Sequence, residues 1–142
     1  MGMLYNSDFH AWTQEQAALL RSGRLSDVDI NNLIEEIESM GKNERRELKS
    51  RLVILIMHLL KWQMQPERQS NSWKATIETQ RFQISELLED SPSLKRELEA
   101  FVNAAYPKAK RFAILETGLI RDSFPPECTY AADDILREGF YP

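Results

Sequence analysis

Residues 51–62 read Arg-Leu-Val-Ile-Leu-Ile-Met-His-Leu-Leu-Lys-Trp, a stretch that is apolar on nearly every side when it is wound into a helix. A helix of that kind has to be surrounded by other helices or by lipid. The apolar run from Leu52 to Leu60 is too short to span a bilayer, and Arg51 and Lys61 flank it. The stretch therefore predicts a buried helix at the centre of a small all-α domain.

Length and composition set the class of protein. A chain of 142 residues fits one domain, and burying about two-thirds of its unfolded surface lets such a domain fold without a disulfide or a metal. The net charge of -4 argues against a surface that binds nucleic acid or an anionic membrane as a whole. Cys128 is the only cysteine, and the first residues lack a signal-peptide pattern. We therefore expect a single cytoplasmic domain over residues 1–142, with no cofactor and no membrane contact.

Helix start and stop signals recur along the chain, and strand alternation is almost absent. Gly41 is interpreted as the stop between the second and third helices, and Pro107 is expected to kink or break the fifth. The second helix has an apolar side that predicts its buried face, made of Ile30, Leu33, Ile34, Ile37 and Met40. The pattern predicts a bundle of five to six helices, the third largely buried, over about 8–21, 27–40, 43–64, 71–89, 92–118 and 131–137.

Polar residues on the two central helices need an explanation. On a helical wheel, one quarter of the third helix carries Arg51, His58, Lys61 and Gln65. This quarter is interpreted as a solvent-facing edge, as a buried polar network that fixes helix register, or as a functional stripe. On the fourth helix, Arg81 borders the apolar side and is expected either to pair with Glu35 or Glu38 or to extend its head into water from the rim. Trp62 and Trp73 flank the intervening turn and are expected to pack together.

Two further groups suggest alternative chemistry. Glu35 and Glu38 lie one helical turn apart, and with His58 they could bind a divalent metal for a hydrolase. Metal-binding bundles of that type usually use Glu-x-x-His motifs, which this chain lacks, so no metal site is predicted. A basic cluster at the start of the third helix could contact phosphates, although Glu44 and Glu47 interrupt it; it consists of Lys42, Arg45, Arg46, Lys49 and Arg51.

Four ordered motifs point to a family. They are Tyr5-x-x-Asp8-Phe9-x-x-Trp12, Leu33-Ile34-Glu35-Glu36-Ile37-Glu38-x-Met40-Gly41, His58-Leu59-Leu60-Lys61-Trp62-x-x-Gln65-Pro66 and Ser72-Trp73-x-x-x-Ile77-x-x-x-Arg81. In these motifs the chain resembles the bacterial family known as domain of unknown function twenty-nine, which is found mostly in cyanobacteria. The resemblance implies a small, single-domain, all-helical protein and brings no established activity.

The family pattern also implies a polar network or cleft between the second, third and fourth helices. Its candidate members are Glu35, Glu36, Glu38, His58, Lys61, Gln65, Trp73 and Arg81. The sequence as a whole favours a protein-interaction module that binds a partner protein or a second copy of itself. The alternatives are a nucleic-acid-binding module that uses Lys42, Arg45, Arg46 and Lys49, and a metal-dependent hydrolase that uses Glu35, Glu38 and His58.

Overall fold

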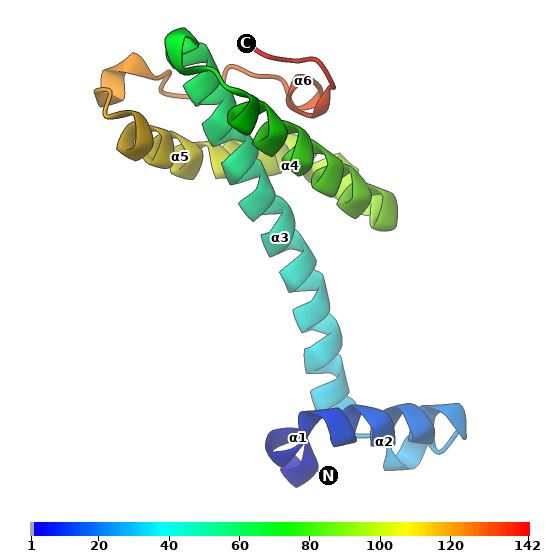
Figure 1. The fold of residues 1–142 in the computed structure, drawn as a ribbon. Coiled ribbons are helices and arrows are strands. Elements are labelled where there is room, and N and C mark those ends of the chain that lie inside the picture. The colour runs from blue at the N-terminus through cyan, green and yellow to red at the C-terminus, as the bar shows by residue number, and fades with distance from the viewer. Residues whose placement is uncertain (1) are drawn as a thin grey trace. The chain divides into compact units, whose positions relative to one another are not determined.

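A computed structural model describes residues 2–142 and contains helices and no strand among them, which confirms the all-α prediction. Its six α-helices are α1 (Gly2–Ser7), α2 (Phe9–Arg21), α3 (Ile30–Met64), α4 (Asn71–Asp90), α5 (Leu98–Thr117) and α6 (Ala132–Leu136) (Figure 1). Contacts divide the chain into two compact units, Met1–Asn43 and Glu44–Pro142. We call them the N-terminal unit and the C-terminal unit, and each is described by itself.

The helix α3 is continuous from Ile30 to Met64, so the predicted stop at Gly41 is wrong. Glycine inside a helix costs only about 1 kcal/mol relative to alanine, and no proline follows Gly41 to prevent the helix from continuing. The predicted second helix, which forms the first part of α3, starts later than its expected beginning at about residue 27. Residues Leu25–Asp27 form a 3-10 turn, η1, and the buried Val28 is extended, so that α3 begins only at Ile30.

In the N-terminal unit, hydrogen bonds attach α2 to the segment that starts α3. The Trp12 side chain is 2% exposed, and its Nε1 donates to Asp29 Oδ2 at 3.1 Å. The Asp29 backbone N–H donates to Gln16 Oε1 at 2.7 Å. From α1, the Tyr5 hydroxyl donates to the Glu36 carboxylate, and this bond and burial raise the pKa of Tyr5 to about 12. These bonds decide which side of α3 the first two helices cover.

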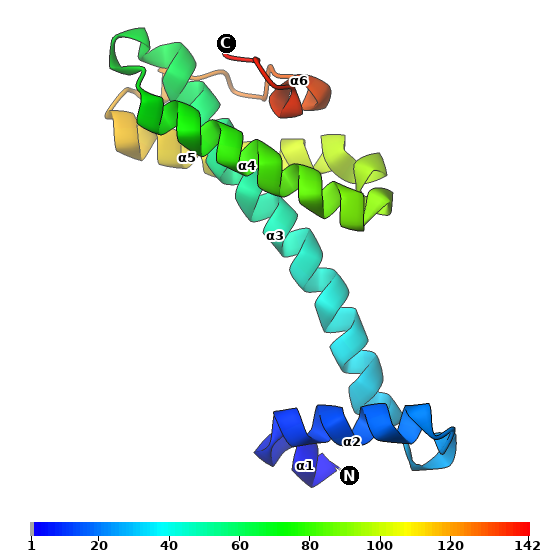
Figure 2. The ribbon, with the colours of Figure 1, turned by 45° about the vertical axis from the view of Figure 1, so that its right-hand side comes forward.

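In the C-terminal unit, the second half of α3 forms the core, as predicted. Figures 1 and 2 show α4 and α5 crossing this part of α3, and α6 packs against both α4 and α5. The fully buried side chains of α3 meet aliphatic residues of α4 and small residues of α5. The centre of the core comprises Leu48, Leu52, Leu55, Ile56, Leu59, Leu60, Ile77, Ile84, Ala105, Ala109 and Ala113.

The helix α5 runs through Pro107 without a break. Proline leaves the carbonyl four residues earlier without its helical partner, and that residue, Asn103, is exposed, so water can bind the carbonyl. The segment before α5, Pro92–Glu97, is a 3-10 turn, η3, rather than the first turns of the predicted helix. Gly118 ends α5 in the left-handed conformation at φ 71°, as its position predicts.

Candidate functional site

An apolar face of α3 in the N-terminal unit is open to solvent. Ile30, Ile34, Ile37 and Met40 follow each other at helical spacing and are 56%, 48%, 57% and 62% exposed. We call these four residues the α3 apolar face. The prediction that they are buried is wrong, because the bonds from Tyr5 and Trp12 attach α1 and α2 at Glu36 and Asp29 instead. An amphipathic pattern predicts a face that packs against a partner, and the described residues of this unit leave the face exposed.

Charged residues border the α3 apolar face on one side. Glu35, Glu38 and Lys42 line a shallow hollow of about 420 Å³ together with Asn31, Ile34 and Ser39. The two carboxylates precede the ammonium group along the helix, so the border changes from negative to positive toward the C-terminal end of this stretch. Glu36, the third candidate acid of this region, bonds to Tyr5 and is not part of this border.

A second candidate group lies in the C-terminal unit around Lys61. This side chain is almost fully buried, and its Nζ donates to Glu116 Oε1 of α5 at 2.8 Å. The same Nζ lies 4.7 Å from the centroid of the Trp73 ring of α4, a cation–π distance. The structure therefore places Lys61 between two of its neighbours, Trp73 of α4 and Glu116 of α5. Sequence spacing gives no signal for Glu116, because its link to α3 depends on how α5 packs.

His58 lies on α3, and Gln65 directly follows the end of this helix. Gln65 is buried, whereas Arg51 and His58 are half-buried, so the interpretation of this quarter as a solvent-facing edge is wrong. His58 Nδ1 lies 2.9 Å from the Ile54 carbonyl oxygen. Because a carbonyl oxygen only accepts, Nδ1 carries the proton and Nε2 is the acceptor nitrogen of the neutral ring. This bond joins two residues of α3 and fixes the orientation of the His58 ring.

This position gives His58 a testable effect on stability. Burial and the Lys61 charge lower the pKa of His58 below its ordinary value of 6.5. The unfolded chain therefore takes up a proton at higher pH than the folded chain, and the free energy of unfolding falls as the pH drops below about 6.5. We expect His58→Gln to reduce the loss of stability between pH 7.5 and 5.5 in urea denaturation. His10→Gln, an exposed control, should leave that loss unchanged, and an equal loss in wild type and His58→Gln would contradict the assignment.

Arg81 is a structural anchor rather than a partner of Glu35 or Glu38. Its Nε donates to the Ile135 carbonyl at 2.9 Å, and one terminal nitrogen donates to the Phe140 carbonyl at 2.5 Å. The other terminal nitrogen bonds to Glu78 at 2.7 Å, one turn earlier on α4. The alternative of a head extended into water is also wrong, because only 5% of the residue is exposed. Arg81 thus attaches the last residues of the chain to α4.

Tyr141 completes this attachment. Its hydroxyl donates to Glu78 Oε1 at 2.5 Å, and burial together with this bond raises the pKa of Tyr141 to about 12. The Tyr141 ring lies 4.8 Å from the Trp62 ring between centroids. The ring partner of Trp62 is therefore Tyr141, and not Trp73 as predicted.

The remaining sequence candidates are the alternative metal ligands and the basic cluster. No group of three His, Cys, Asp or Glu side chains within residues 2–142 is placed to hold a metal ion, so Glu35, Glu38 and His58 do not form one. In the basic cluster, Arg45 bonds to Glu97 at 2.7 Å and its guanidinium lies 4.9 Å from the Phe101 ring centroid. The remaining exposed cations of the cluster are Lys42, Arg46 and Lys49.

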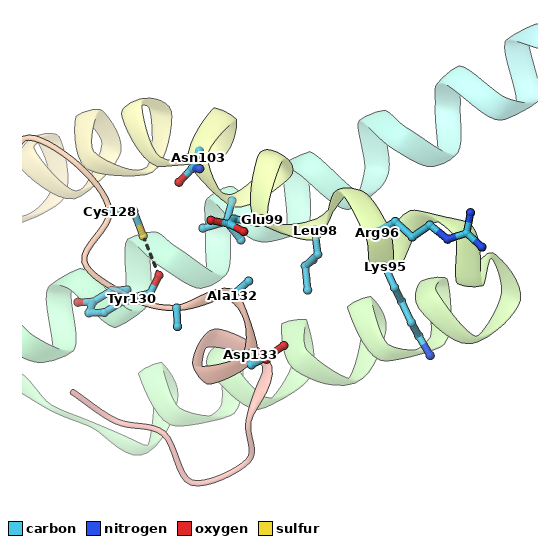
Figure 3. Close-up of a pocket in the computed structure, with 11 residues that line it drawn as sticks. Lys95, Arg96, Leu98, Glu99, Asn103, Cys128, Tyr130, Ala132 and Asp133 are labelled. Carbon is cyan, nitrogen blue, oxygen red and sulfur yellow. Dashed lines mark hydrogen bonds between the residues drawn. The ribbon is translucent and has the colours of Figure 1, made fainter.

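A hollow of about 460 Å³ lies between the start of α5 and the segment before α6, and Cys128 lines it (Figure 3). The Cys128 thiol donates to the Tyr130 carbonyl at 3.6 Å, and burial raises its pKa, which is the opposite of what a reactive thiolate needs. Lys95 and Arg96 extend away from Cys128 in Figure 3, so neither cation is placed to stabilise a thiolate. This hollow shows no catalytic arrangement.

The comparison with known families decides membership. The model of the family described as "Domain of unknown function DUF29" matches residues 4–141, almost the whole chain. The chain belongs to the DUF29 family. No curated protein and no solved structure matches this DUF29 chain. Within the described residues, no helix of the DUF29 protein is long and apolar enough to cross a membrane.

Proposed function

We propose that this DUF29 protein is a self-associating interaction module, and that the α3 apolar face of one copy packs against the same face of a second copy. The observation that carries the proposal is that four large aliphatic side chains, Ile30, Ile34, Ile37 and Met40, lie together on one helix side and are about half exposed or more. Contiguous apolar surface of this kind is typical of a protein-binding site. The single cysteine supports a cytoplasmic location for this assembly.

The charged border favours a second copy in antiparallel orientation. In a parallel two-fold pair, the charged borders of the two copies lie on opposite sides of the apolar contact, so Glu35 and Glu38 gain no charged partner there. In an antiparallel pair, the two borders lie beside each other in opposite directions, and a two-fold axis near residues 38–40 brings Glu35 and Glu38 opposite Lys42 of the second copy. Opposite charges beside an apolar contact select orientation and register. A two-fold axis also satisfies both copies with one self-complementary surface and produces a closed dimer.

The test is the molar mass in solution. Sedimentation equilibrium of the full chain over a range of concentrations should give a mass that rises from 16.6 kDa toward twice that value. We expect Ile34→Glu/Ile37→Glu to remain at the monomer mass, because two carboxylates would be buried in an apolar contact without partners.

The matched control changes two other exposed aliphatic residues. Leu115 and Ile120 are 69% and 73% exposed and lie in the C-terminal unit. Leu115→Glu/Ile120→Glu therefore replaces two exposed aliphatic side chains by carboxylates, as Ile34→Glu/Ile37→Glu does. This variant should associate like the wild type. A wild-type chain that stays monomeric, or a control variant that loses association to the same degree, would overturn the proposal.

A further inference from the structure

We propose that the C-terminal unit carries a binding site for a small amphipathic organic anion, such as a medium-chain carboxylate, in a hollow between α5 and the loop that follows it. The hollow has a volume of about 420 Å³. We call it the α5 hollow, and it is lined by Pro107, Lys110, Arg111, Ile114, Leu115, Arg121 and Pro126. The proposal is independent of self-association, since it uses none of the residues of the α3 apolar face.

The loop that forms one wall of the α5 hollow is held in place. Gly118 ends α5 in the left-handed conformation and turns the chain back toward the helix. Phe124 is 2% exposed and anchors the returning loop in the core. The Tyr106 hydroxyl then donates to the Pro125 carbonyl at 2.6 Å, next to Pro126. The wall is therefore preformed, which is the usual property of a small-molecule site.

The charges around the α5 hollow have one sign. Lys110, Arg111 and Arg121 line it, and none of its lining residues is acidic, although the whole chain carries a net charge of -4. The ion pairs found among residues 2–142 involve none of these three cations. Glu116, the acid of α5 closest to them in sequence, bonds to Lys61 instead. Guanidinium groups bind carboxylates and sulfonates with two parallel hydrogen bonds, so this rim fits an anionic head group.

The rest of the lining is apolar. Pro107, Ile114, Leu115 and Pro126 offer only carbon side chains, and Leu115 is 69% exposed. Cations beside hydrocarbon select a ligand that has both an acid and a hydrophobic body. The volume lies near the lower end of ligand sites, roughly 300–1,000 Å³, which favours a chain of medium length over a lipid with two tails.

Isothermal titration of the full chain with sodium octanoate tests this site. We expect saturable binding, and an affinity that falls about fourfold for each methylene removed toward hexanoate, because the chain is buried against apolar side chains. Arg111→Glu/Arg121→Glu should weaken octanoate binding about tenfold or more, since both head-group contacts become repulsive. The control Arg46→Glu/Lys49→Glu changes the net charge equally at exposed sites of α3 and should bind like the wild type.

Uncharged 1-octanol has the same hydrocarbon chain without the acid, so it tests what the cations contribute to binding. It should bind at least about tenfold more weakly than octanoate. Equal affinity for the alcohol and the acid would overturn the proposal, because the cations would then contribute nothing. Wild-type affinity in Arg111→Glu/Arg121→Glu, equal weakening in the control variant, or no saturable binding of octanoate would overturn it as well.

Discussion

Arg81→Met is expected to lower the free energy of unfolding by at least about 3 kcal/mol, because a hydrogen bond from a charged group contributes roughly 1.5–3 kcal/mol and the two bonds to main-chain carbonyls are lost together. The methionine keeps the length and apolar stem of the side chain, so packing changes little. The carbonyls of Ile135 and Phe140 lose their donor, and Glu78 loses its cation. The last residues of the chain should then detach from α4.

Urea denaturation followed by circular dichroism measures this effect, with Arg137→Met as the matched control. Arg137 pairs with Asp134 one turn away, but its side chain is 62% exposed, and exposed pairs contribute about 0–1 kcal/mol. We expect a small change for the control and a large one for Arg81→Met. A loss below about 1 kcal/mol for Arg81→Met would contradict the role of this residue as an anchor, since one buried hydrogen bond alone accounts for that much.

Leu59→Ala is expected to cost about 3–4 kcal/mol of unfolding free energy, since large-to-small changes at buried leucines cost roughly 2–5 kcal/mol. Leu59 is 0% exposed, and residues of α3, α4 and α5 form the core cluster to which it belongs. The helices around it are held by their connections, so they can move only partly into the space that the side chain leaves. A cavity therefore adds to the lost burial.

The same denaturation experiment on Leu25→Ala supplies the control. Leu25 is 61% exposed in the N-terminal unit, and its truncation should change stability by no more than about 0.5 kcal/mol. If Leu59→Ala behaved like Leu25→Ala, the second half of α3 would not be the centre of the core.

The central helix was predictable because its own residues decide its surroundings. The stretch from Leu52 to Leu60 contains one polar residue, His58, and is otherwise apolar all round, so it is buried wherever the other helices lie. Gly41 shows the opposite case. Glycine is compatible with both the end and the interior of a helix, and only the neighbouring structure decides between them. In this chain no left-handed turn follows, and α3 continues.

The α3 apolar face shows what periodicity leaves open. The spacing of Ile30, Ile34 and Ile37 identifies one side of a helix, and it says that this side packs against apolar surface. It does not say which element supplies that surface. The bonds of Trp12 and Tyr5 place α1 and α2 elsewhere, and these bonds join residues 17 and 31 positions apart, which no local pattern indicates.

The contacts of the polar candidates differ in how far apart the partners lie in the sequence. Lys61 and Trp73 lie on two helices joined by a short turn, and Lys61 Nζ lies 4.7 Å from the centroid of the Trp73 ring. The contact of Lys61 with Glu116 and those of Arg81 with Ile135 and Phe140 span more than 50 residues each. Such partners follow from the packing of whole helices, so the sequence could indicate that these charges needed partners but could not name them.

Distances between spin labels in two associated copies test the central proposal most directly. Cys128→Ser removes the single native cysteine, and one label can then be placed at Asn31, Ser39 or Asn43 of α3. In an antiparallel pair, the distance between equivalent labels grows by up to about 3 Å for each residue away from the two-fold axis, twice the helical rise. With the two-fold axis near residues 38–40, the proposal predicts the shortest distance at Ser39, a longer one at Asn43 and the longest at Asn31. Equal distances at all three positions, or no signal between copies, would contradict it.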